Sequence, residues 1–132
     1  MYLKELNLEE KGAFYSLAQS MVAADGVFGD EEKVMMSQYL QEMNITRSEA
    51  AIMTEAAALE VFTKSPNTTK RKVFVELVSL SLCDGTMEAA ENQMLVRVSK
   101  IMGFSRHLTN QLIDCVKLVT ATYDKMSKLI NS

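Results

Sequence analysis

The sequence predicts an all-α protein, a single helical bundle of six to seven helices. Its 132 residues are 48% apolar and 23% charged, which is typical of one globular domain. Good helix formers dominate, and there is a single proline. Along most of the chain, apolar residues recur at steps of three and four, the period of an amphipathic helix.

The first helix is expected to begin near residue 8. Asn7 and Glu10 stand where an N-cap and the third helical residue would be, and an apolar stripe then includes Phe14, Leu17 and Met21. Gly26 follows the stripe, as a left-handed residue after a helix should.

Two further helices are expected in the first half. The second carries one inward face, made of Glu32, Met35, Met36, Tyr39 and Met43. The third is predicted to start at a capping box formed by Thr46 and Glu49 and to run to about Phe62. Ser65-Pro66-Asn67 then interrupts the helical pattern.

The second half repeats this order and ends in a long helix. A helix that ends at Gly85 is followed by another that ends at Gly103, and Ser105 can cap the last one. The apolar seam of the last helix alternates steps of four and three, through Leu112, Val116, Val119, Tyr123, Met126 and Ile130. We expect this seam to pack onto its own bundle, while pairing with a second chain, as in a homodimer, stays open.

A constant offset of 59 positions relates the two halves. It pairs Asp25 with Asp84, Gly26 with Gly85, Glu32 with Glu91, Met35 with Met94, Met43 with Met102, and Arg47 with Arg106. A tandem duplication is the simplest explanation. We therefore predict one domain over residues 1–132, with internal repeats at about 8–62 and 67–130.

Each repeat contains an Asp-Gly-x-apolar-x-x-x-Glu loop. This pattern matches the second half of an EF-hand calcium loop, but Met21 and Ala23 occupy the places where the first oxygen ligands would be. One such loop cannot surround a calcium ion. Phe28 and, in the second copy, Met87 are expected to plug the core.

The loops place four carboxylates on the apolar stripes: Asp25, Glu32, Asp84 and Glu91. A buried carboxylate must be paired, hydrogen-bonded or coordinated. In one interpretation each acid stabilises only its own turn or helix start. In the other, all four converge on a shared site for a hard divalent ion such as Ca²⁺ or Mg²⁺.

Other classes of function are disfavoured. The formal net charge of −3 argues against nucleic acid as a partner. No leader segment and no apolar run of roughly 20 residues is present, which predicts a cytoplasmic protein without membrane insertion. Cys83 and Cys115 do not form a Cys-x-x-Cys pair and are expected to be buried thiols, and Asp84 should raise the thiol pKa of Cys83. His107 is the one histidine, so an acid/base partner for an enzyme is missing.

Because it contains both of these loops, the sequence resembles the TerB-like family, a group of bacterial domains named after tellurite-resistance proteins. Residues 18–47 and 77–107 carry the resemblance, through Ala24-Asp25-Gly26 with Glu31-Glu32 and through Cys83-Asp84-Gly85 with Glu91. The family usually has Ser-Pro-Glu-Glu after the apolar residue, where this chain has Gly29-Asp30-Glu31-Glu32 and Glu88-Ala89-Ala90-Glu91. The resemblance implies a helical bundle, a bacterial cytoplasmic setting, links to stress response, acidic residues that hold metal, and no enzymatic activity.

The leading prediction is therefore a non-enzymatic module that binds a divalent ion through the paired loops and acts on a protein partner. One alternative is a metal-independent protein-interaction scaffold, since the ten methionines could form an adaptable apolar groove. A metal-dependent hydrolase is the other alternative.

Overall fold

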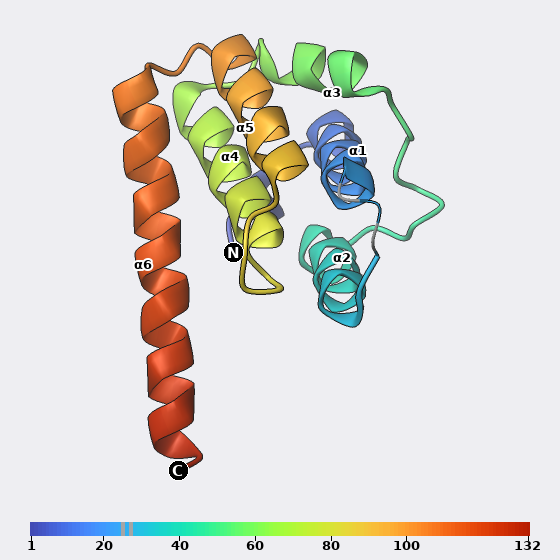
Figure 1. Ribbon diagram of the computed structural model, residues 1–132. Coiled ribbons are helices and arrows are strands. Elements are labelled where there is room, and N and C mark those ends of the chain that lie inside the picture. The colour runs from blue at the N-terminus through green and yellow to red at the C-terminus, as the bar shows by residue number, and fades with distance from the viewer. Residues whose placement is uncertain (25, 27) are drawn as a thin grey trace.

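The computed structural model describes residues 1–24, 26 and 28–132, which form helices and no strand. After a short 3₁₀ turn at Leu3–Glu5 come the helices α1 (Leu8–Ala24), α2 (Asp30–Met43), α3 (Glu55–Phe62), α4 (Asn67–Ser81), α5 (Ala89–Ile101) and α6 (Arg106–Ile130) (Figure 1). The prediction of an all-α bundle of six to seven helices is confirmed.

Helix α1 lies at the centre of the bundle and packs against α2, α3, α4 and α5. Its start follows the sequence prediction, because Asn7 Oδ1 accepts the Glu10 N–H at 2.8 Å and Glu10 Oε1 accepts the Asn7 N–H at 3.0 Å. The predicted stripe is fully buried at Phe14, Leu17 and Met21. The ring of Phe14 meets Tyr39 of α2 edge to face, with 5.0 Å between ring centroids.

The bounds of the helices follow the offset of 59. Helices α1 and α4 begin at residues 8 and 67, and α2 and α5 begin at residues 30 and 89. The turns between them match as well, since Gly26 and Gly85 have φ angles of +75° and +104°. A side chain at either position would be strained in that left-handed conformation, so glycine is needed there.

The third helix differs from its prediction. Thr46 and Glu49 do form the expected reciprocal cap, with hydrogen bonds of 2.9 and 3.3 Å, but they close only a turn. Residues 51–54 are not helical, and α3 begins at Glu55, where Thr54 Oγ1 accepts the Ala57 N–H at 3.2 Å.

Contacts with α1 explain this difference. Ser16 Oγ accepts the Met53 N–H at 2.9 Å, and it lies 2.9 Å from the Gly12 carbonyl oxygen and 3.2 Å from that of Ala51. A Cβ at Gly12 would lie 3.3 Å from the backbone of Ala51, so only glycine permits this close approach without adjustment. A helix through residues 51–53 would forfeit these tertiary hydrogen bonds, and the segment stays outside the helix.

Helix α6 differs from the prediction that its whole apolar seam packs onto the bundle. Its first half packs against α4 and buries Thr109 and Val116, but beyond residue 116 no residue of the helix is buried. The reason is length, because 25 residues of α6 span about 37 Å whereas the 15 of α4 span about 22 Å. The end of α6 therefore projects past the bundle, as Figure 1 shows in red.

None of the helices in the described part of the chain is long and apolar enough to cross a membrane.

Candidate functional site

Two of the four predicted metal ligands are buried at equivalent helix starts. Glu32 is the third residue of α2 and 3% exposed, and Glu91 is the third residue of α5 and 2% exposed. Each carboxylate caps its own helix: Glu32 Oε1 accepts the Gly29 N–H at 3.1 Å, and Glu91 Oε1 accepts the Glu88 N–H at 2.9 Å. The burial of two acids therefore has a local structural reason in each repeat.

The remaining two predicted ligands differ from this pair. Asp84 is exposed, and its Oδ1 accepts the Thr86 N–H at 3.3 Å, a bond that ties down its own turn. Asp25 lies outside the described residues.

Acidic residues of both repeats affect the thiol pKa of Cys83. Its thiol pKa is raised to about 12, first by burial and then by the negative charges of Glu32, Asp84, Glu31 and Glu91. Glu32 and Glu91 thus act on the same sulfur atom from different repeats. The expectation that Asp84 raises the Cys83 pKa is confirmed, and a raised pKa is the opposite of what a nucleophilic thiol needs.

The expectation that both thiols are buried was wrong. Cys83 is only half-buried, and Cys115 is exposed on α6. The first half of α6 packs against α4, and Cys115 lies away from that contact.

The donor chemistry at the loops suits a hard divalent ion, because carboxylate oxygens are its preferred ligands. Within residues 1–24, 26 and 28–132, however, no three His, Cys, Asp or Glu side chains come together in an arrangement that would hold a metal ion. Glu32, Asp84 and Glu91 therefore do not form such a group by themselves in the described part of the chain.

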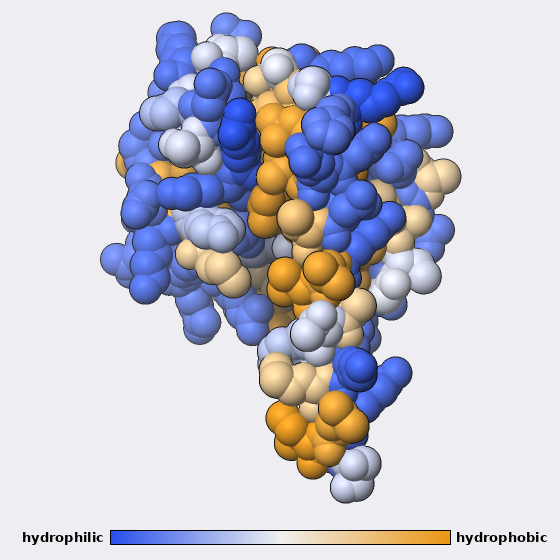
Figure 2. Space-filling model, turned by 90° about the vertical axis from the view of Figure 1, so that its left-hand side faces the viewer, coloured by the Kyte–Doolittle hydropathy of each residue, from blue (hydrophilic) through white to orange (hydrophobic). Residues whose placement is uncertain are grey.

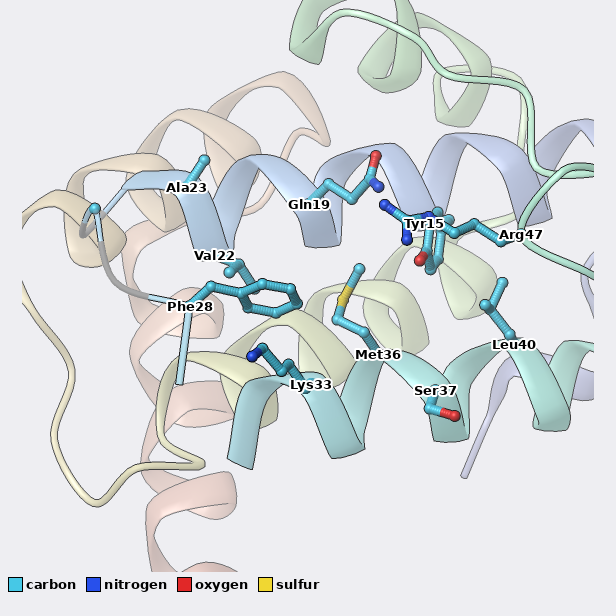
Figure 3. Close-up of a pocket in the computed structure, with 11 residues that line it drawn as sticks. Tyr15, Gln19, Val22, Ala23, Phe28, Lys33, Met36, Ser37, Leu40 and Arg47 are labelled. Atoms are coloured by element: carbon cyan, nitrogen blue, oxygen red, sulfur yellow. The ribbon is translucent and has the colours of Figure 1, made fainter. Parts of the chain in front are cut away.

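A groove whose place in the fold the sequence did not predict lies beside the first loop (Figure 3). It has a volume of about 760 Å³ and runs between α1 and α2. Its lining residues come from α1, the first loop, α2 and the turn after α2, and they are Tyr15, Gln19, Val22, Ala23, Gly26, Phe28, Lys33, Met36, Ser37, Leu40 and Arg47.

Phe28 corrects the expectation of a core plug. Met87, its counterpart in the second repeat, is half-buried against the core, but Phe28 is 52% exposed and covers one end of the groove. The Lys33 ammonium lies 5.7 Å from the centroid of its ring, a cation–π contact. The two loops are therefore unlike on this side, because the first loop offers an aromatic ring to solvent.

Apolar walls and two cations give the groove its chemical character. Met36 and Val22 form its floor and are nearly fully buried, while Lys33 and Arg47 stand toward its two ends (Figure 3). Such a groove suits a ligand with an apolar body and acidic groups. The sequence signal for it was present in Phe28, an aromatic residue in the loop before α2, but the helix pattern could not say which side of the loop the ring would occupy.

His107 lies far from the second loop in the fold. It is exposed at the second residue of α6, beyond the C-terminal end of α5, whereas the second loop precedes the N-terminal end of that 13-residue helix. The two helix ends are about 20 Å apart, too far for the imidazole to act on a group at that loop.

No family model, curated protein or solved structure matches this chain. The resemblance to the TerB-like family, carried by the two loops, accordingly stays a prediction.

Proposed function

We propose that this chain is a non-enzymatic binding module of the TerB type, in which a divalent cation held between the two loops sets the shape of the α1–α2 groove for a protein partner. The ligands would be Glu32 and Glu91, with Asp84 and Asp25. Ca²⁺ or Mg²⁺ is the favoured ion, since all four are hard oxygen donors. A bacterial, cytoplasmic role in stress response belongs to the same proposal, as part of the TerB-like resemblance.

The single observation that carries the proposal is the structural equivalence of Glu32 and Glu91, since each is a nearly fully buried carboxylate at the third residue of its helix, 59 positions apart. Both also contribute to the raised pKa of the Cys83 thiol, which supports a common region for the two acids. A bound cation would supply positive charge that neutralises these acids and links the start of α2 to the start of α5.

The first turn of α2 would pass the effect of the bound cation on to the groove. Glu32 lies in the first turn of α2, and the next residue, Lys33, lines the groove together with Phe28. A shift of this turn would move the ring of Phe28 and the ammonium of Lys33 together, because the two are already in contact. The groove would then accept an amphipathic partner segment whose acidic residues meet Lys33 and Arg47.

Calorimetric titration of chelator-treated protein with Ca²⁺, Mg²⁺ and Mn²⁺ tests the metal site. We expect heat of binding and, at 100 times the dissociation constant, a stabilisation of about 2.7 kcal/mol, which raises the melting temperature on the order of 10 °C. Amide NMR signals of Phe28 and Lys33 should shift during the same titration.

Glu32→Gln and Glu91→Gln are the informative variants. A glutamine oxygen can still accept the capping N–H, so the fold should survive while a charged ligand is lost. Glu88→Gln is the matched control, since Glu88 is exposed in the same loop as Glu91. We expect at least tenfold weaker binding for each buried variant and unchanged binding for the control.

One observation favours the metal-independent scaffold as a second candidate. The described acids already have structural tasks, because Glu32, Glu91 and Asp84 each accept a backbone N–H within their own turn. If titration gives neither heat nor a change in melting temperature, the metal site is refuted and the groove remains as the site of partner binding.

A further inference from the structure

The projecting half of α6 carries a large apolar surface without a partner in the described chain. Its exposed apolar side chains, with the fraction of each that is exposed, are Leu118 (68%), Val119 (64%), Tyr123 (67%), Met126 (49%), Leu129 (68%) and Ile130 (73%). Figure 2 shows orange side chains on this projecting end, which continue an apolar band that runs up the middle of the body between hydrophilic surfaces. Burying these side chains would stabilise any assembly that covers them.

The seam of α6 has two parts with different surroundings. In the first part, Leu112 and Val116 pack on the bundle. In the second part, the seam is exposed to solvent and consists of Val119, Tyr123, Met126 and Ile130. Steps of three and four alternate without a break along both parts, which is the spacing of the two apolar positions of a coiled-coil heptad.

Charges are confined to the other side of the projecting half. With Val119, Tyr123, Met126 and Ile130 at the core positions of the heptad, the positions that flank them are Thr120, Thr122, Ser127 and Leu129. All four are uncharged. The charged residues Lys117, Asp124, Lys125 and Lys128 fall on the outer positions. Two identical helices could therefore meet along this face without opposing like charges.

We propose that the projecting half of α6 pairs with the same segment of a second copy of this chain. Val119, Tyr123, Met126, Leu129 and Ile130 each carry on the order of 150 Å² of surface, about two-thirds of it exposed, so they present on the order of 500 Å² per chain. Two copies would bury on the order of 1,000 Å², the lower limit for a specific interface.

The marginal stability of an unpacked helix also supports a second copy of this chain as the partner of the projecting half. Residues 118–130 are helical but lie beyond the last buried residue of α6. An isolated helix shorter than about 12 to 15 residues is marginal in water, so a segment of this length holds its helix better against a partner. A second copy supplies a helix of the same length and spacing.

Sedimentation velocity and light scattering of the purified chain test the proposal. An interface of this size belongs to the weak class, so we expect the mass of two chains at roughly 100 µM and a shift toward one chain on dilution. A mass of one chain at every concentration would overturn the proposal.

Neighbouring residues provide a matched pair of variants. Val119→Lys places a charge in the seam and should abolish the dimer. Leu118→Lys is the control: Leu118 is as exposed as Val119 but lies about 100° around the helix, outside the seam, so the dimer should persist. Because both side chains lie on the projecting part, neither variant should lower the melting temperature of a monomer. Loss of the dimer in both variants, or in neither, would contradict pairing through the seam.

A membrane surface is the competing occupant, since an amphipathic helix with three lysines could lie on anionic lipid. Co-sedimentation with vesicles of phosphatidylcholine and phosphatidylserine distinguishes the two. A chain that stays single in solution but binds these vesicles would refute self-association. A dimer whose projecting helix is covered should leave the vesicles without bound protein.

Discussion

The hydrogen bonds of Ser16 should account for a measurable part of the stability of this fold. In the change Ser16→Ala, the Met53 N–H loses the acceptor that now lies 2.9 Å away, and the link between α1 and the non-helical segment 51–53 is broken. Ser16 is only 3% exposed, so water cannot readily replace the hydroxyl.

Two effects oppose each other in this variant. An N–H left without its acceptor costs about 1–3 kcal/mol, whereas alanine favours the helix interior over serine by about 0.5 kcal/mol. The free energy of unfolding should therefore fall by about 0.5–2.5 kcal/mol. With a urea m value of roughly 1.5–2 kcal/mol/M, the midpoint should move down by roughly 0.3–1.7 M.

Urea denaturation followed by far-ultraviolet circular dichroism measures this change, and Ser20→Ala is the control. Ser20 lies one turn further along α1 and is half-buried, and it takes part in none of the hydrogen bonds described for this protein. Its replacement should be neutral or slightly stabilising. Amide hydrogen exchange should show lost protection at Met53 only in Ser16→Ala. Equal midpoints for both variants, with protection at Met53 retained, would refute the account of why α3 begins late.

Three further predictions concern the core and the thiols. Phe74 is fully buried, and its ring meets that of Phe104 edge to face with 5.5 Å between the ring centroids. Phe74→Ala should therefore lower the free energy of unfolding by about 3–5 kcal/mol in the same denaturation experiment. Phe28→Ala, which removes an exposed ring, should lower it by less than about 1 kcal/mol. Similar losses in both would contradict the assignment of Phe28 to the groove. Burial and neighbouring carboxylates raise the Cys83 pKa to about 12, so only about one in ten thousand of these thiols is ionised at pH 8. A disulfide reagent should therefore react quickly with the exposed Cys115 alone. The variant Cys115→Ser should remove this fast phase of the reaction. Since the native state keeps the Cys83 proton to a higher pH than the unfolded chain, this thiol should also lower the stability as pH rises above its ordinary pKa of 9.0, an effect that Cys83→Ser removes from a denaturation series.

Local interactions made much of the fold predictable. The reciprocal cap of Asn7 and Glu10, the left-handed Gly26 and Gly85, and the Ser105 cap of α6 each involve residues within a few positions of one another. Such patterns depend on the chemistry of neighbouring residues and the period of the helix, both of which the sequence states directly. The equivalence of Glu32 and Glu91 was visible for the same reason.

What only the tertiary structure decided depends on distances between remote parts of the chain. Residues 51–53 are not helical because Ser16, some 35 positions away, binds their backbone and Gly12 lets it approach closely, and the seam of α6 is half exposed because α4 is the shorter helix. Phe28 faces the groove and not the core, a choice between two sides of one loop that no periodicity contains. The sequence by itself determined the helices, their caps and the duplicated acidic loops, because these follow from local chemistry. Where two elements stop touching, and which surfaces are left for a ligand or a partner, follows from their packing in three dimensions.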